Sequence, residues 1–304
     1  MAKQFPKERV VLQGKRVLLT ANYSVIEPLF ALHLGGILRE EGIPWTFFPV
    51  KKYDFAPLFK RVEQFGATHV GFNVYSGNHK QMYAAADELR KRGVKVIIGG
   101  PHATYFAQAC TEHADVVCKG QSFESFRAIM RDDIEGFVRE TVKNNIWKTQ
   151  FKTIYDEYKR EHGLLPNAKL EGDDLKMVER TTEARVREIM GGDESVKLRI
   201  ANILASRILF RDSLSDTFPK PDRATFYSDN PDMRDNPIKN AICGEGCPFA
   251  CTYCYNRAWN EPEMYGKFNR RVLRKVADVV EELAELKDFN TKLVYFQDDV
   301  FFFE

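Results

Sequence analysis

Apolar runs and amphipathic segments alternate along the first 130 residues of the chain. Strands are predicted where a run is apolar almost throughout, over residues 15–24, 45–50, 68–76, 94–100 and 114–120. Helices are predicted where apolar side chains recur three and four residues apart, over residues 27–43, 57–67, 79–93 and 103–112 and again from 122. Parallel strands need such helical crossovers, and strands apolar on both faces need cover on both sides. The pattern therefore predicts an open, doubly wound α/β parallel sheet.

The strand pattern stops after residue 123, and helical spacing continues to about residue 215. A break at residues 163–166 divides this region into two helical stretches, whose aromatic side chains we interpret as core rather than as a ligand site. Residues 215–237 are rich in Pro, Asp and Asn, which is typical of a linker. We therefore predict an α/β domain, a helical region with its linker and a C-terminal part, at residues 1–130, 131–237 and 238–304.

The C-terminal part combines a short strand, a cysteine-rich loop, a helix and a last strand. The first strand is predicted over residues 238–246. The helix is predicted over 270–286 because the segment is strongly amphipathic, with Asn269 in position to cap it. The last strand is predicted from residue 291 to the end of the chain.

Composition and charge exclude several classes of protein. The chain has 304 residues and a formal net charge of +2, so no overall basic field favours nucleic acid. The sequence contains no run of about 18 apolar residues, the length that a membrane span requires. Its N-terminus lacks the features of a signal peptide. We therefore expect a cytoplasmic protein. Four of the six cysteines lie between residues 243 and 254, which in a reducing compartment favours metal ligation over disulfides.

The cysteine loop offers three closely spaced thiolates, Cys247, Cys251 and Cys254, in a C-x3-C-x2-C pattern. Three thiolates on a short loop can hold three irons of a [4Fe-4S] cubane. The fourth iron then has no protein ligand, whereas ferredoxin clusters that only transfer electrons usually have four. An open iron can bind a substrate or cofactor directly.

The sequence CPFACTYCYN, which follows Gly246 and a predicted strand, resembles the signature loop of the radical S-adenosylmethionine (SAM) superfamily. The resemblance implies that the open iron chelates SAM and that Tyr253, before the last cysteine, lies near its adenine. It also implies a small-molecule substrate and an electron donor such as a flavodoxin or ferredoxin. The core of that family is a (β/α) barrel, and its reactions here would be of the methyltransferase or cyclase type.

Two other interpretations of the loop stay open, and both recruit Cys243 as a fourth thiolate. One is a structural zinc site, although zinc loops usually pair their cysteines at C-x2-C spacing and only one such pair is present. The other is a four-thiolate cluster that only transfers electrons. We interpret Cys243 itself as a small buried residue of the preceding strand.

The N-terminal sheet should bind a ligand where its strands end at their carboxyl side. Its turns contain neither G-x-G-x-x-G nor a Walker sequence, so nucleotide cofactors lack support. The order of the turns is similar to that of the Rossmann-like cobalamin-binding domain found ahead of many radical SAM cores. That resemblance assigns the cobalamin tail to four residues: Ser76, Gly99, Gly100 and Gly120.

Two features of this domain depart from the cobalamin pattern. The usual Gly-Glu after the fifth strand is Gly120-Gln121 here, and the Asp-x-His-x-x-Gly sequence that supplies a cobalt ligand is absent. We interpret His33, which precedes Leu34-Gly35-Gly36, as a helix-packing residue and expect no histidine from that sequence on cobalt. The alternative is a flavodoxin-like sheet with another ligand or none.

The end of the chain contains Gln297, Asp298 and Asp299, which by the same resemblance would lie near the SAM amine, although the usual Gly-Gly-Glu is absent. The barrel would be truncated after its second strand, so we expect the N-terminal part of a longer cobalamin-dependent radical SAM enzyme. Two further hypotheses stay open. The chain could be a corrinoid-binding module with an inert core, or an interaction protein stabilised by zinc or a four-thiolate cluster.

Overall fold

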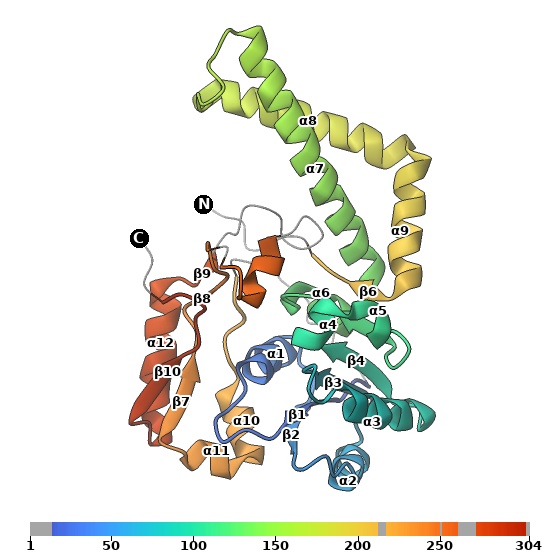
Figure 1. The fold of residues 1–304 in the computed structure, drawn as a ribbon, viewed down its shortest axis with the longest axis vertical. Coiled ribbons are helices and arrows are strands. Elements are labelled where there is room, and N and C mark those ends of the chain that lie inside the picture. Colours follow the sequence, from blue (N-terminus) through green and yellow to red (C-terminus); the bar gives the residue numbers. More distant parts are fainter. Residues whose placement is uncertain (1–13, 212–216, 250, 261–271, 302–304) are drawn as a thin grey trace. The chain divides into compact units, whose positions relative to one another are not determined.

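The computed structural model describes residues 14–211, 217–249, 251–260 and 272–301, although the side chains of residues 258–260 are not described. Contacts divide the chain into two compact units. One consists of Met1–Asp132 together with Ile208–Glu304, and the other of Asp133–Arg207. Figure 1 shows the helices and strands of each unit.

The first unit is built on a six-stranded sheet in the order β2-β1-β3-β4-β5-β6, in which every neighbouring pair is parallel. Its strands are β1 Val17–Asn22, β2 Trp45–Val50, β3 His69–Asn73, β4 Lys95–Gly99, β5 Val116–Cys118 and β6 Ile208–Leu209. The crossover helices are α1 Leu29–Glu40, α2 Ala56–Phe65, α3 His79–Lys91, α4 Pro101–Tyr105, α5 Ala107–Cys110 and α6 Phe123–Met130. The predicted α/β sheet of parallel strands and helical crossovers is confirmed.

The sequence prediction missed β6. We expected no strand between residues 123 and 215, whereas Ile208 and Leu209 pair with Val117 and Cys118 and extend the sheet. A strand of two residues has no alternation to detect, and the apolar run around it continues the helical spacing of the preceding segment. The prediction was therefore wrong at this point.

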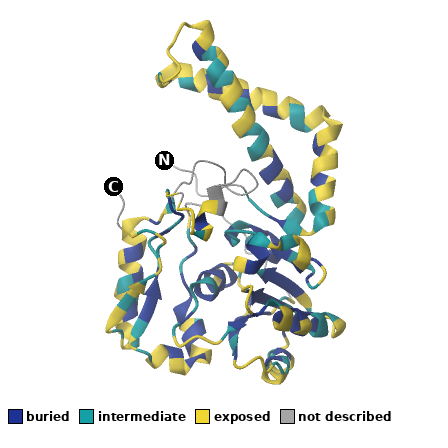
Figure 2. Ribbon diagram, in the orientation of Figure 1, coloured by how far each residue is buried: buried dark blue, intermediate teal, exposed yellow. Residues whose placement is uncertain are grey.

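The two faces of the sheet are covered by different helices, because successive side chains of a strand point to opposite sides. One face includes Leu18, Val70 and Ile98 and belongs to a buried core with side chains of α2 and α3. The opposite face includes Leu19 and Ile97, which lie on the side of α1 and α6. Figure 2 shows the strands of this sheet and α1 as mostly buried.

The second unit contains three helices, α7 Ile134–Glu161, α8 Gly172–Gly192 and α9 Glu194–Ser206. Val138, Val142 and Val178 are buried among these helices. Most of the surface of the three helices is exposed (Figure 2). The aromatic side chains of α7 are half-buried, and Trp147 stacks on Phe151 with ring centroids 4.7 Å apart. The helical character of this region is confirmed. No helix among the described residues is long and apolar enough to cross a membrane.

The C-terminal segment of the first unit is made of short elements. They are α10 Arg223–Asp229, α11 Pro231–Asp235, β7 Ile238–Ala241, β8 Gly244–Glu245, η1 Tyr255–Asn260, β9 Val272–Leu273, α12 Val276–Leu286, η2 Lys287–Phe289 and β10 Leu293–Phe296. β7 and β10 pair in parallel, and β8 and β9 pair antiparallel. One parallel pair with a helix between its strands is compatible with the start of a barrel, which stays a prediction.

Three predicted boundaries in this segment need correction. The strand expected over residues 238–246 ends at Ala241, and Gly244–Glu245 form a separate strand, β8. The helix expected from residue 270 begins at Val276, because Val272 and Leu273 pair with β8 instead. The last strand ends at Phe296 rather than at the end of the chain. The proposed cap, Asn269, lies outside the described residues.

A buried group of charges joins the C-terminal segment to the sheet. The Arg223 guanidinium donates to Glu27 at 2.9 Å and to the Asn240 carbonyl at 2.7 Å, and it also pairs with Glu282. Arg274 pairs with the second oxygen of Glu282 at 2.5 Å. Glu27 follows β1, Asn240 lies in β7 and Glu282 in α12, so the network connects the loop after β1 with both C-terminal elements.

The linker before α10 lies directly against α1. Asp222 N–H donates to the Leu32 carbonyl at 3.0 Å, and a Cβ on Gly36 would come within 2.0 Å of the Lys220 carbonyl oxygen. A Cβ on Gly35 would come within 2.1 Å of the Trp45 ring, whose N–H donates to Asp222 at 2.9 Å. Glycine at both positions therefore allows this close packing.

Candidate functional site

A cavity of about 230 Å³ lies between the sheet and the helices α1 and α6. Leu19, Gly71 and Ile97 are register neighbours on β1, β3 and β4 and form its sheet side. Gly71 has no side chain in the middle of this row, and a Cβ there would lie 2.8 Å from Leu19 Cδ2. The missing side chain therefore leaves room over the sheet.

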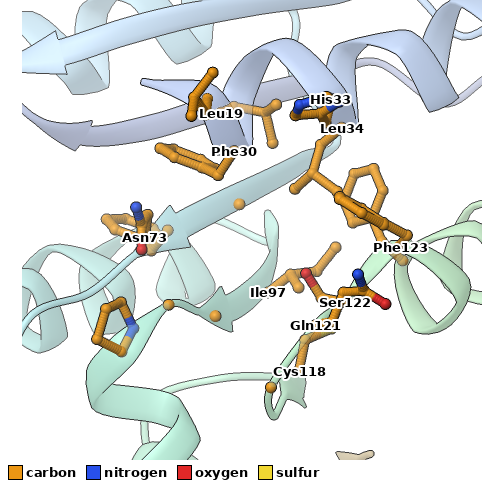
Figure 3. A pocket seen from close by; sticks show the side chains of 18 of the residues that line it. Leu19, Phe30, His33, Leu34, Asn73, Ile97, Cys118, Gln121, Ser122 and Phe123 are labelled. Atoms are coloured by element: carbon orange, nitrogen blue, oxygen red, sulfur yellow. The ribbon is translucent and has the colours of Figure 1, made fainter. Parts of the chain in front are cut away.

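The walls of the cavity are mainly apolar, with a few polar groups near the strand ends. Phe30 and Leu34 of α1 and Phe123 and Phe126 of α6 are among its apolar side chains. The polar side chains that line it are His33, Asn73, Gln121, Ser122 and Glu245. Figure 3 shows Asn73 and Phe123 on opposite sides of the cavity. Such a mostly apolar cavity with few polar groups is typical of a small-molecule site.

The turn after β4 requires glycine. Gly100 has φ +93°, and a Cβ on it would lie 1.9 Å from Asn73 Oδ1 and 2.9 Å from the Val74 nitrogen. At Gly99 a Cβ would meet Cys118 O only at 3.8 Å, which is ordinary contact. Gly120 also has a positive φ, +71°. These turns bring bare backbone to the edge of the cavity.

The structure brings three of the four residues expected for the cobalamin tail to this cavity. Gly99, Gly100 and Gly120 line it, but Ser76 does not. The Ser76 hydroxyl lies 3.0 Å from His102 Nδ1, in a separate hollow next to His79. β3 ends at Asn73, three residues before the predicted end of the strand, so Asn73 occupies the place at the cavity where we expected Ser76.

Asn73 is a site residue that the sequence analysis missed. It is 8% exposed, and its Oδ1 has no hydrogen-bond partner among the described residues. A buried polar atom without a partner is costly unless a ligand or water supplies one. The available signal was its position as the first polar residue after the apolar run of β3.

His33 packs inside α1, as expected, but it also lines the cavity. Its Nδ1 lies 2.7 Å from the Pro219 carbonyl, which can only accept, so Nδ1 has the proton. The ring lies near Phe123 and Phe218, with centroids 5.7 Å and 6.0 Å away. Burial lowers the pKa of His33 to about 4, so the imidazole is neutral at neutral pH.

This shift predicts a loss of stability in mild acid. The pKa of folded His33 lies below its ordinary value of 6.5, so the unfolded chain binds the proton first. The His33 contribution is intact above pH 6.5 and is lost as the pH falls toward 4, by about 3 kcal/mol in all. We expect His33→Gln, whose amide can still donate to Pro219, to weaken the acid dependence of urea unfolding. His162→Gln, at an exposed position, should leave it unchanged, and equal slopes in the two variants would contradict the assignment.

The cysteine loop has a varied environment. Cys247 is 8% exposed, Cys254 is half-buried and Cys251 is exposed, and Cys254 N–H donates to the Cys251 carbonyl at 3.1 Å. Tyr253 is 91% exposed. Among the residues that the structure describes, which exclude Ala250 of this loop, no three His, Cys, Asp or Glu side chains are grouped to hold a metal. Ligation by these cysteines stays a prediction.

The acidic end of β10 lies beside the start of the cysteine loop. Gln297 N–H donates to the Ala241 carbonyl at 2.9 Å, and Asp298 Oδ2 accepts from the Cys243 nitrogen at 2.9 Å. Cys243 is half-buried and follows β7 rather than lying in it, so our interpretation of a buried strand residue was wrong. Burial raises the pKa of Glu245 to about 7, and the nearby Asp299 adds to this effect.

The comparison with known families decides the nature of the sheet. Residues 15–130 match the family model of the B12 binding domain. This part of the chain is a B12-binding domain. The matched range of the B12-binding domain extends from before β1 to the last residue of α6 and includes 18 of the 20 residues that line the cavity. A comparison with curated proteins gave no match.

The B12-binding domain accounts for cobalamin binding, and its cavity fits part of that cofactor. An apolar cavity of roughly 150 Å³ accommodates one benzene ring, so 230 Å³ suits a bicyclic base better than a corrin ring. The gap at Gly71, the bare turn at Gly100 and the partnerless oxygen of Asn73 are features that a bound ligand would use.

Proposed function

We propose that the chain is the N-terminal part of a cobalamin-dependent radical SAM enzyme that acts on a small molecule. The observation that supports this most is the tandem order of a B12-binding domain, a strand and a C-x3-C-x2-C loop. The contact between Asp298 and Cys243 also supports it, because it brings the end of β10 beside the start of the cysteine loop.

In this proposal the B12-binding domain holds the nucleotide tail of cobalamin. Gly99, Gly100 and Gly120 let the backbone approach the tail, and Asn73 offers it a hydrogen bond. The apolar side chains of α1 and α6 enclose the base. Cobalamin, when bound, supplies methyl-transfer or radical chemistry that no side chain provides.

The C-terminal segment would hold the second cofactor pair. Cys247, Cys251 and Cys254 would ligate three irons, with Tyr253 near the adenine of SAM. Gln297, Asp298 and Asp299 would orient the amine of SAM through their polar groups. The cluster, when bound, supplies one electron for the cleavage of SAM. An electron donor such as a flavodoxin or ferredoxin would then return an electron to the cluster.

Anaerobic reconstitution with iron, sulfide and hydroxocobalamin tests the proposal. The chain should retain both iron and cobalamin after desalting, and reduction in the presence of SAM should release 5′-deoxyadenosine. Cobalamin without SAM cleavage would favour the corrinoid-binding module. Zinc without iron would contradict the radical SAM assignment.

Gly100→Ala tests the cobalamin site specifically. The added Cβ forces Asn73 or the backbone of Val74 to move, and an alanine at positive φ costs about 1–2 kcal/mol. We expect at least about tenfold weaker binding of hydroxocobalamin, measured by equilibrium dialysis. Gly77→Ala is the matched control, because a Cβ there meets nothing within 4 Å. Equal affinity of both variants would place the tail elsewhere.

A further inference from the structure

The cavity of the B12-binding domain is completed by residues outside that domain. Ile242 and Glu245, which follow β7, line it together with the side chains from residues 15–130. Glu245 is the one acidic side chain among the lining residues. A polar group that comes from the C-terminal segment therefore faces the same space as the turns after β3, β4 and β5.

The backbone at Glu245 is fixed on both sides. Gly244 and Glu245 form β8 and pair with Leu273 and Val272 of β9. The pairing is close, since a Cβ on Gly244 would lie 2.4 Å from the Val272 carbonyl oxygen. Upstream, Asn240 N–H donates to Glu27 of the B12-binding domain at 2.9 Å. Glu245 is thus held in place by elements that contact the domain directly.

The side chain of Glu245 is also held. Gln121 Nε2 donates to Glu245 Oε2 at 2.7 Å, and Gln121 itself follows β5 and lines the cavity. In the part of the chain that the structure describes, no cationic side chain forms an ion pair with Glu245. A carboxylate has about four acceptor positions, and Gln121 fills one of them. The remaining positions can accept N–H or O–H donors from a ligand.

We propose that Glu245 contacts the cofactor: its carboxyl group accepts a hydrogen bond from an amide side chain of the corrin ring. The C-terminal segment then completes the B12 site, and binding of cobalamin stabilises the attachment of that segment. This inference rests on the proposed use of the cavity for cobalamin.

The chemistry of the cofactor selects the amide as the partner. The phosphate of the nucleotide tail is an anion, which a carboxylate repels. The bicyclic base belongs in the apolar part of the cavity, between Leu19 and Leu34. The periphery of the corrin ring has primary amides, and the contact between Gln121 and Glu245 already pairs an amide N–H with this carboxyl group.

The experiment compares Glu245 variants of the full chain with two corrinoids, hydroxocobalamin and dicyanocobinamide, which lacks the nucleotide tail. We expect Glu245→Leu to weaken binding of both about tenfold, because a buried hydrogen-bond acceptor is lost. Glu245→Gln retains an acceptor oxygen and should bind within about threefold of the wild type. Glu281→Leu, on the exposed side of α12, is the matched control.

The outcomes separate the inference from the proposed function. Wild-type chain that binds neither corrinoid would refute both. Tight wild-type binding that Glu245→Leu leaves unchanged would overturn only the role of Glu245, as would a loss seen with cobalamin but not with cobinamide. Should Glu245→Leu fail to fold, Glu245→Ala removes the carboxyl group without adding bulk, and it is judged by the same comparison.

Discussion

Cys251→Ser is expected to lower the iron bound after anaerobic reconstitution from about four atoms per chain to nearly none. Three thiolates are the minimum set for a cubane with one open iron, and a serine hydroxyl does not replace a thiolate at neutral pH. Cys251 is exposed, so its substitution should leave the fold intact. Iron and sulfide assays, with circular dichroism to check the fold, measure the effect.

Two other cysteine variants make this experiment decisive. Cys110→Ser is the control, since the Cys110 thiol is buried next to the Tyr83 hydroxyl at 3.1 Å and a serine can keep that contact. It should bind iron like the wild type. Cys243→Ser should also retain the cluster if three thiolates hold it. Loss of iron in Cys243→Ser would instead support a four-thiolate cluster, and undiminished iron in Cys251→Ser would contradict our assignment.

Arg223→Met is expected to lower the free energy of unfolding by about 3–5 kcal/mol. Arg223 is 2% exposed and lies between Glu27 and Glu282, both of which are buried. Removing Arg223 takes its positive charge away from these two buried carboxylates. The loss of stability is then larger than the net stabilisation that the intact ionic group provides. Urea unfolding followed by circular dichroism gives the difference.

An exposed ion pair provides the comparison. Arg185 and Glu188 pair on the surface of α8 at 2.8 Å, and Arg185→Met should cost no more than about 0.5 kcal/mol. The double variant Arg223→Met with Glu27→Gln should recover part of the loss, because it removes one of the uncompensated carboxylates. If Arg223→Met costs as little as Arg185→Met, the buried network does not contribute to stability as we infer.

The sheet could be predicted from the sequence because its first five strands are apolar on both faces and are separated by helices. Of the six strands of this sheet, only β6 was not predicted, because a strand of two residues shows no alternation of apolar and polar positions. The start of α12 was misplaced for a related reason. Val272 and Leu273 fit the helical spacing of the residues after them, but pairing with β8 takes them out of the helix.

The site was harder to predict because its residues come together through contacts distant in sequence. Gly99, Gly100 and Gly120 follow strands and could be found from the turns. Asn73 was missed by three residues through an error in the end of β3. Glu245 had no signal, since nothing in the sequence indicates that residues 121 and 245 will form a hydrogen bond.

The order of the strands along the chain has a consequence for synthesis on the ribosome. Strand β5 ends at Cys118, but its neighbour β6 is made only about 90 residues later, after four helices. At about 5–20 residues per second, the edge of β5 waits roughly 5–20 s for its partner. An unpaired strand edge can pair with other chains, so the nascent protein should depend on chaperones during this interval more than the finished one does.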